Sequence, residues 1–157
     1  MKKIILVLSL VLTMGMVGCS SKGDNEYKDV SVSQIQKAIE SSKDLVEQSL
    51  PYEINNFDYF NDVQDKITEG FIIRAAINLR LEDVIVIKTE DPDAIYTTLE
   101  SYKEDMIMRP FGDGYGAEEN AEYAANTIVE KKGDYVYLIS AKNAANIEKT
   151  ILSVISK

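Results

Sequence analysis

The stretch Asp83-Val84-Ile85-Val86-Ile87 is the clearest structural signal in the sequence, because four consecutive β-branched residues are typical of a buried strand. Before it, residues 71–82 alternate apolar and polar side chains, which favours a second strand. A helix is the alternative, because some of the same apolar residues also fit helical spacing. After it, Asp91 and Pro92 supply an N-cap and a proline at the first helical position. The helix predicted there has one apolar face, formed by Ile95, Leu99, Tyr102 and Met106.

The same order of elements recurs near the C-terminus. Residues 127–130 and 135–139 flank Lys131-Lys132-Gly133-Asp134, which is a strong hairpin pattern, and a helix is expected from about Asn143. Two strand–strand–helix (ββα) units side by side predict an α+β domain with a four-stranded, mainly antiparallel sheet and helices covering one face. The other face of that sheet would stay partly open to a ligand or a partner.

The residues before these units predict an N-terminal helix, packed at an edge of the sheet or as a third helix. Ser31-Val32-Ser33-Gln34 is a capping box, and apolar residues recur at helical spacing up to Leu50. Pro51 disfavours helical backbone at Leu50, so the helix is expected to end there. Residues 52–61 predict an irregular packed segment, and residues 62–68 predict a short helix.

The N-terminus has the layout of a secretory signal peptide. Two lysines precede the apolar run 4–17, which is shorter than the roughly 20 residues that span a bilayer as a helix. Met16-Val17-Gly18-Cys19-Ser20 resembles the lipobox of bacterial lipoproteins, in which diacylglycerol is attached to the cysteine and cleavage occurs just before it. We therefore expect residues 1–18 to be removed, although an ordinary signal peptide or membrane anchor with an incidental Cys19 is the alternative.

Lipidation of Cys19 predicts a protein anchored to the membrane on its extracytoplasmic face. Each buried methylene contributes about 0.8 kcal/mol, stable attachment needs more than one acyl chain, and diacylglycerol supplies two. Residues 20–26 contain no apolar side chain and are typical of a flexible linker. We therefore expect a tether over residues 19–29 and a single domain over residues 30–157.

Composition excludes several classes of function. The 157 residues include no histidine, no tryptophan and one cysteine, and the net charge is −9. Histidine-dependent catalytic triads, histidine zinc sites and an internal disulfide are therefore impossible in this chain. The negative charge also argues against binding to nucleic acid, which requires a basic surface.

Three features together resemble one protein family. They are the strand pattern of residues 81–88, the amphipathic helix with Tyr102 near its end, and the hairpin pattern of residues 128–136. With the N-terminal lipobox, they are similar to the domain of unknown function family 4358, and the resemblance covers roughly residues 30–155. It implies a small lipoprotein or secreted protein of a Gram-positive bacterium with this fold. It implies no catalytic residues, because the family has no assigned activity.

Three groups of residues are candidates for a binding site, and the first two lie in a loop and on a strand. Asp113, Tyr115 and Glu118 lie in and beside a glycine-dense stretch that must form a loop, before a brief helix predicted over residues 118–125. Their oxygen atoms suit calcium, but the spacing of an EF-hand is absent, so a solvated loop is the simpler interpretation, and we expect no metal and no cofactor. Tyr135 and Tyr137 share one face of a strand, where they form either an exposed binding surface or the cover of the sheet.

Arg74, Asn78 and Arg80 are a third group, which the alternating pattern places on the outward face of the first hairpin. Two arginines in an acidic protein indicate either an anion contact or a surface of ion pairs. The functional prediction is a non-enzymatic binding or accessory lipoprotein that recruits a protein or a small ligand. The alternative is a cell-envelope hydrolase with a carboxylate pair, for which Asp113 with Glu118 or Glu119 are the candidates.

Overall fold

Five antiparallel strands form the centre of the molecule, in the order β1-β2-β3-β5-β4. The computed structural model describes residues 26–77, 79–109 and 116–157. The strands are β1 (Ser49–Tyr52), β2 (Ile67–Ala75), β3 (Asp83–Thr89), β4 (Ile128–Lys132) and β5 (Tyr135–Ser140). The helices are α1 (Val32–Ser41), α2 (Pro92–Met108), α3 (Ala117–Ala125) and α4 (Ala144–Ile155). The predicted α+β class is confirmed, with five strands in the sheet instead of four.

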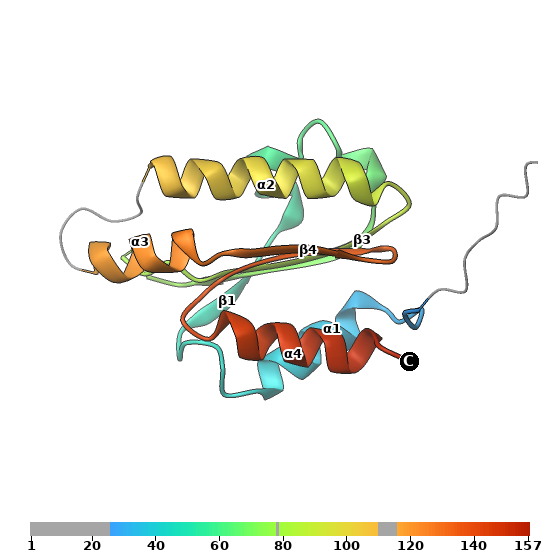
Figure 1. The fold of residues 1–157 in the computed structure, drawn as a ribbon, viewed down its shortest axis with the longest axis horizontal. Helices are drawn as coiled ribbons and strands as arrows, with labels where there is room; N and C mark the ends of the chain where they lie inside the picture. The colour runs from blue at the N-terminus through green and yellow to red at the C-terminus, as the bar shows by residue number, and fades with distance from the viewer. Residues whose placement is uncertain (1–25, 78, 110–115) are drawn as a thin grey trace, which may run out of the picture.

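Helices cover both faces of the sheet, so the prediction of one open face is wrong (Figure 1). Strand β3 shows the reason. Val84 and Val86 are buried beneath α1 and α4, whereas Ile85 and Ile87 are buried on the other face, which α2 and α3 cover. A strand that carries apolar side chains on both of its faces needs other elements packed against both faces. The order strand–strand–helix does occur twice, as β2-β3-α2 and β4-β5-α4, but its two helices lie on opposite faces.

The N-terminal helix is shorter than its apolar pattern suggests. It ends at Ser41, because the Ser42 hydroxyl and amide both donate hydrogen bonds to the carbonyl of Ile39 and replace the next helical turn. The chain then forms β1, the strand that carries Pro51. A proline is tolerated in β1 because this strand lies at the edge of the sheet.

The irregular segment predicted between β1 and β2 is confirmed. It contains the short 3₁₀ turns η1 (Ile54–Asn56) and η2 (Asp58–Phe60). The short helix predicted over residues 62–68 is not formed. A single 3₁₀ turn, η3 (Gln64–Lys66), occupies its place, and β2 starts directly after it. The predicted hairpin and the helices that follow β3 and β5 are confirmed.

The first described residues are held against the domain. Tyr27 forms an isolated β-bridge with Ser156, and the amide of Lys28 donates to the carbonyl of Ile155 at 2.6 Å. The Tyr135 hydroxyl donates to the carbonyl of Val30 at 2.6 Å and accepts from the Val30 amide at 2.7 Å. Residues 27–29 of the predicted tether therefore contact the domain. Figure 1 shows this entry point beside the C-terminus, at the end of the molecule opposite α3.

Candidate binding cleft

A cavity of about 380 Å³ lies at one end of the sheet, between the second half of α2 and the adjoining ends of β2 and β3. Its lining combines charged and tyrosine side chains with a few apolar ones. The lining residues are Tyr59, Arg74, Ala75, Arg80, Leu81, Glu82, Asp83, Tyr102, Asp105, Met106 and Arg109. A concave site with convergent polar groups is the usual form of a small-ligand site.

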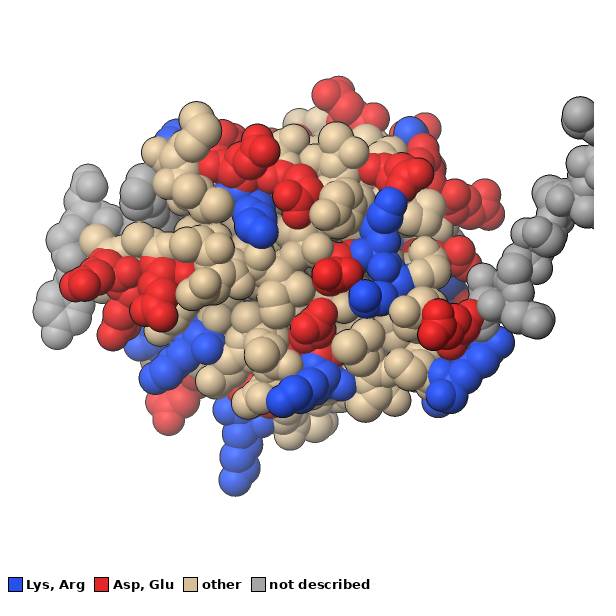
Figure 2. All heavy atoms as spheres, viewed as in Figure 1, with Lys and Arg blue, Asp and Glu red and all other residues tan. Residues whose placement is uncertain are grey.

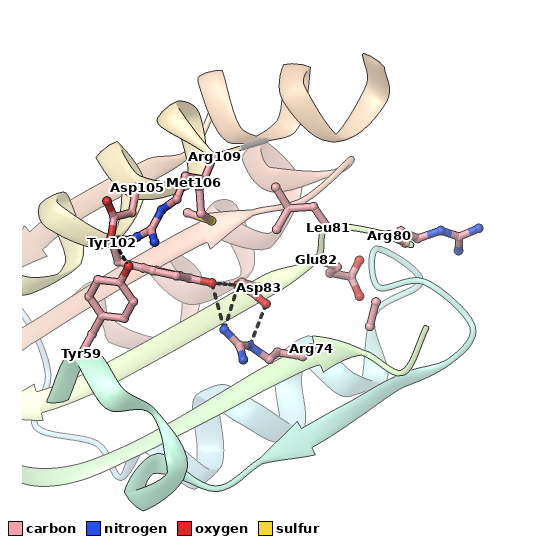
Figure 3. Close-up of a pocket in the computed structure, with 11 residues that line it drawn as sticks. Tyr59, Arg74, Arg80, Leu81, Glu82, Asp83, Tyr102, Asp105, Met106 and Arg109 are labelled. Carbon is pink, nitrogen blue, oxygen red and sulfur yellow. Dashed lines mark hydrogen bonds and ion pairs between the residues drawn. The ribbon is translucent and has the colours of Figure 1, made fainter. Parts of the chain in front are cut away.

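An ion pair at the inner wall of the cleft fixes its geometry. Arg74 and Asp83 lie directly opposite each other in the β2–β3 ladder, and Arg74 Nε lies 3.0 Å from Asp83 Oδ1. The Tyr102 hydroxyl, which α2 supplies, donates to Asp83 and accepts from Arg74 Nη2 at 2.9 Å. Figure 3 shows these three side chains pointing toward one another. Two strands and a helix therefore meet in one polar cluster.

This cluster is largely removed from water. The Asp83 side chain is 7% exposed, and the Arg74 guanidinium lies 4.6 Å from the centre of the Tyr52 ring and 5.2 Å from that of the Phe57 ring. Burial and the neighbouring Asp83 carboxylate raise the pKa of Tyr102. Burial alone would lower the pKa of Arg74, but Asp83 outweighs it and the pKa of Arg74 is raised. Arg74 therefore stays charged and Tyr102 stays protonated at neutral pH.

A second polar group forms the outer rim. The Tyr59 hydroxyl, which the turn η2 supplies, donates to Asp105, and Arg109, the C-cap residue of α2, pairs with the same carboxylate. The hydrogen bond from Tyr59 lowers the pKa of Asp105, and so does the charge of Arg109. The rim carboxyl is therefore ionised at neutral pH. Arg80 extends away from both groups at the other side of the cleft (Figure 3).

Glu82 is a buried carboxyl that connects the cleft to the loop after α1. It accepts hydrogen bonds from the Val46 amide at 3.1 Å and from the Ser49 hydroxyl. Burial raises the pKa of Glu82 above its ordinary value, and these two hydrogen bonds only partly oppose that shift. The folded protein therefore holds this proton more tightly than the unfolded chain does.

This shift predicts a dependence of stability on pH. A raised pKa in the folded state favours folding below the ordinary glutamate value of 4.5, and that contribution is lost as the pH rises through the raised pKa. The variant Glu82→Gln, which cannot titrate, should show a flatter decline of stability from pH 4.5 towards neutrality. It should stay within about 1 kcal/mol of the wild type at pH 7, because the amide oxygen can still accept from Val46. Urea unfolding across this range measures both slopes, and identical slopes would contradict the assignment.

The residues singled out from the sequence lie apart from one another. Tyr135 and Tyr137 are buried in the core beneath α1 and α4, so they form no exposed surface. Glu118 is exposed in the first turn of α3. Asp113 and Tyr115 lie outside the described residues, as does Cys19. Within residues 26–77, 79–109 and 116–157, no three potential metal ligands come together.

Most of the cleft was not predicted, because its members are far apart in the sequence. The arginines gave a usable signal. The sequence indicates either an anion contact or ion pairs for these arginines. Arg74 forms an ion pair, whereas Arg80 is exposed and lines the cleft. Asn78, the third member of that group, lies outside the described residues. Asn120 was missed: it fixes α3 to the β2–β3 connection by accepting from the Leu81 amide and donating to the Leu79 carbonyl, both at 2.8 Å.

Together, the fold and the cleft define a small three-layer α+β domain with a polar cavity at one end of its sheet. A family model described as a domain of unknown function (DUF4358) matches residues 41–141, more than half of the chain. The protein therefore belongs to this family, which confirms the resemblance found in the sequence. The match includes every residue that lines the cleft, and it stops before α4. No curated protein and no solved structure gives a significant match.

Proposed function

We propose that this protein is a lipoprotein anchored through Cys19 to the extracytoplasmic face of the membrane, and that it serves as a binding or accessory module with the cleft as its ligand site. The observation that carries the proposal is the cleft itself. Its inner wall is held rigid by Arg74, Asp83 and Tyr102, while Arg80 and Arg109 remain accessible at its edges. A rigid wall with accessible polar groups suits recognition.

The point at which the chain enters the domain supports an orientation in which the cleft faces away from the membrane. In the β3–β5 ladder, Asp83 is opposite Ser140 at the cleft end, whereas Lys88 is opposite Tyr135 at the end that holds Val30. Residues 20–26 span at most about 25 Å when fully extended. A lipid on Cys19 would therefore keep the entry point near the membrane and present the cleft away from it. Among the described residues, no helix is long and apolar enough to cross a bilayer.

The partners of the cleft carboxyls favour binding over hydrolysis. A hydrolase with a carboxylate pair needs one carboxyl that carries a proton near neutral pH. Asp105 has a lowered pKa, and Asp83 is held by Arg74 and Tyr102. Glu82 has a raised pKa, but its oxygens are occupied by Val46 and Ser49. Among its described residues, the cleft therefore offers ion pairs for recognition and no accessible protonated carboxyl.

The anchoring half of the proposal is tested by fractionating cells that produce the protein. The wild type should be found in the membrane fraction, and Cys19→Ser should be released or left unprocessed, because no acyl chains can be attached. Ser21→Ala is the matched control, since it changes a neighbouring residue and keeps the cysteine. Equal retention of Cys19→Ser and wild type in processed form would contradict lipid anchoring.

The binding half is tested on the mature protein in detergent, by thermal unfolding against small ligands of different charge. A ligand at 100 times its dissociation constant should stabilise the protein by about 2.7 kcal/mol and raise the unfolding midpoint by several degrees. Tyr59→Phe should reduce the shift, because it removes the rim hydroxyl that orients Asp105. Ser153→Ala on α4 is the control. A shift that Tyr59→Phe and Ser153→Ala leave equally intact would place the ligand outside the cleft.

A further inference from the structure

All of the arginines of the chain line this one cleft. The chain has 17 basic residues, of which only Arg74, Arg80 and Arg109 are arginines, and none of the lysines in the described part of the chain lines the cleft. Arginine presents five N–H donors in a planar fork that matches a carboxylate or a phosphate, whereas lysine offers a single point charge. The concentration of this residue type at the cleft therefore indicates a particular ligand chemistry.

The cleft has hydrogen-bond donors left over and few acceptors. Both oxygens of Asp83 are occupied by Arg74 and Tyr102, and one oxygen of Asp105 is occupied by Tyr59 and Arg109. Arg109 uses one nitrogen for its ion pair, and its side chain is 73% exposed. Among the described residues, the guanidinium of Arg80 has no hydrogen bond or ion pair. An incoming ligand is therefore offered N–H donors.

We propose that the cleft binds the carboxylate or phosphate group of a small organic anion, with Arg109 as its contact on one side and the exposed Arg80 side chain, which points outward in this structure, turning in towards the anion from the other. This inference rests on the proposed function and adds the chemical class of the ligand. Arg74 forms the fixed wall behind the anion and keeps its own carboxylate partner. The side chains of Leu81 and Met106 line the same cavity and would contact the organic part of the ligand.

The charge of the remaining surface makes such binding specific. On the face shown in Figure 2, acidic side chains gather over the layer formed by α2 and α3. A protein with a net charge of −9 does not attract anions at long range. Affinity for an anion must therefore come from direct contact with the guanidinium groups, and non-specific anion binding should be weak.

The test uses the mature protein in detergent, titrated with sodium citrate in one arm and sodium phosphate in the other, with sodium chloride at matched ionic strength as the blank. At least one arm should raise the unfolding midpoint by several degrees beyond the blank. The arm that binds more tightly distinguishes a carboxylate ligand from a phosphate ligand. Lysine and glucose provide a cationic and a neutral comparison.

Four variants locate the contact. Arg109→Gln and Arg80→Gln should each weaken binding about 10- to 100-fold, since each removes charge-assisted hydrogen bonds to the anion. Lys149→Gln, on the exposed side of α4, removes the same charge and should leave the affinity unchanged. Arg109→Lys should bind between the wild type and Arg109→Gln, because it keeps the charge and loses the fork.

The outcomes separate this inference from the proposed function. Equal loss of affinity in Lys149→Gln and Arg109→Gln, or shifts no larger than those in sodium chloride, would overturn anion binding. If glucose or lysine raised the midpoint, and Tyr59→Phe but neither arginine variant reduced that shift, the cleft would still be a binding site and only its assignment to anions would be wrong.

Discussion

Replacing Asp83 by alanine is expected to lower the free energy of unfolding by about 3 to 5 kcal/mol, because it leaves the charge of Arg74 unpaired in a buried site. The Asp83 side chain is 7% exposed and that of Arg74 is 29% exposed, so water can solvate the remaining guanidinium only in part. The Tyr102 hydroxyl also loses the carboxylate to which it donates, which loosens α2 against the sheet. The same substitution should therefore weaken ligand binding at the cleft.

Urea unfolding of the variant and the wild type measures this loss. Asp93→Ala is the matched control, because Asp93 pairs with Lys131 at the surface with 85% of its side chain exposed, and such pairs contribute at most about 1 kcal/mol. The double variant Asp83→Ala with Arg74→Met should be more stable than Asp83→Ala alone, since no unpaired charge remains. If Asp83→Ala cost no more than Asp93→Ala, the ion pair would not hold the cleft together.

Local patterns in the sequence were sufficient to predict individual elements. The β-branched run at Asp83–Ile87 forms β3, and Asp91 caps α2 by accepting from the Ala94 amide at 3.2 Å. The hairpin around Gly133 forms because this glycine takes a left-handed backbone conformation with φ of 62°, which other residues rarely adopt. Each of these features depends on neighbouring residues, so each is visible without the fold.

The arrangement of the elements depends on contacts between distant residues. Pro51 lies in a strand, not at a helix end, because β1 pairs with β2 at the edge of the sheet. Arg74 and Asp83 face each other through the β2–β3 register, and Tyr102 reaches them only because α2 packs on that face. Periodicity shows that a residue is on an apolar or polar face, but it does not show which face of the sheet a helix covers. The cleft therefore became visible only with the structure.

Replacing Tyr135 by phenylalanine is expected to lower the free energy of unfolding by about 2 kcal/mol and to release the segment that enters the domain. The hydroxyl donates to the carbonyl of Val30 and accepts from the Val30 amide, and it lies 3.2 Å from the carbonyl of Lys28, so its loss leaves partly buried backbone groups without partners. Burial raises the pKa of Tyr135, which keeps the hydroxyl protonated and able to donate. The aromatic ring stays in the core in this variant, so the change isolates the hydrogen bonds.

Hydrogen exchange of the Val30 amide distinguishes a local from a general effect. In Tyr135→Phe this amide should exchange faster than in the wild type by more than the loss of global stability explains, because its acceptor is gone. Tyr137→Phe is the control: it removes an equally buried hydroxyl, which donates to Glu148 at 2.9 Å on α4 and makes no bond to the entering segment. An unchanged exchange rate of the Val30 amide in Tyr135→Phe would contradict the attachment of the entering segment through the Tyr135 hydroxyl. If Cys19 carries the lipid that we propose, the Tyr135 hydroxyl would set the length of chain between that lipid and the folded domain, and so the distance of the cleft from the membrane.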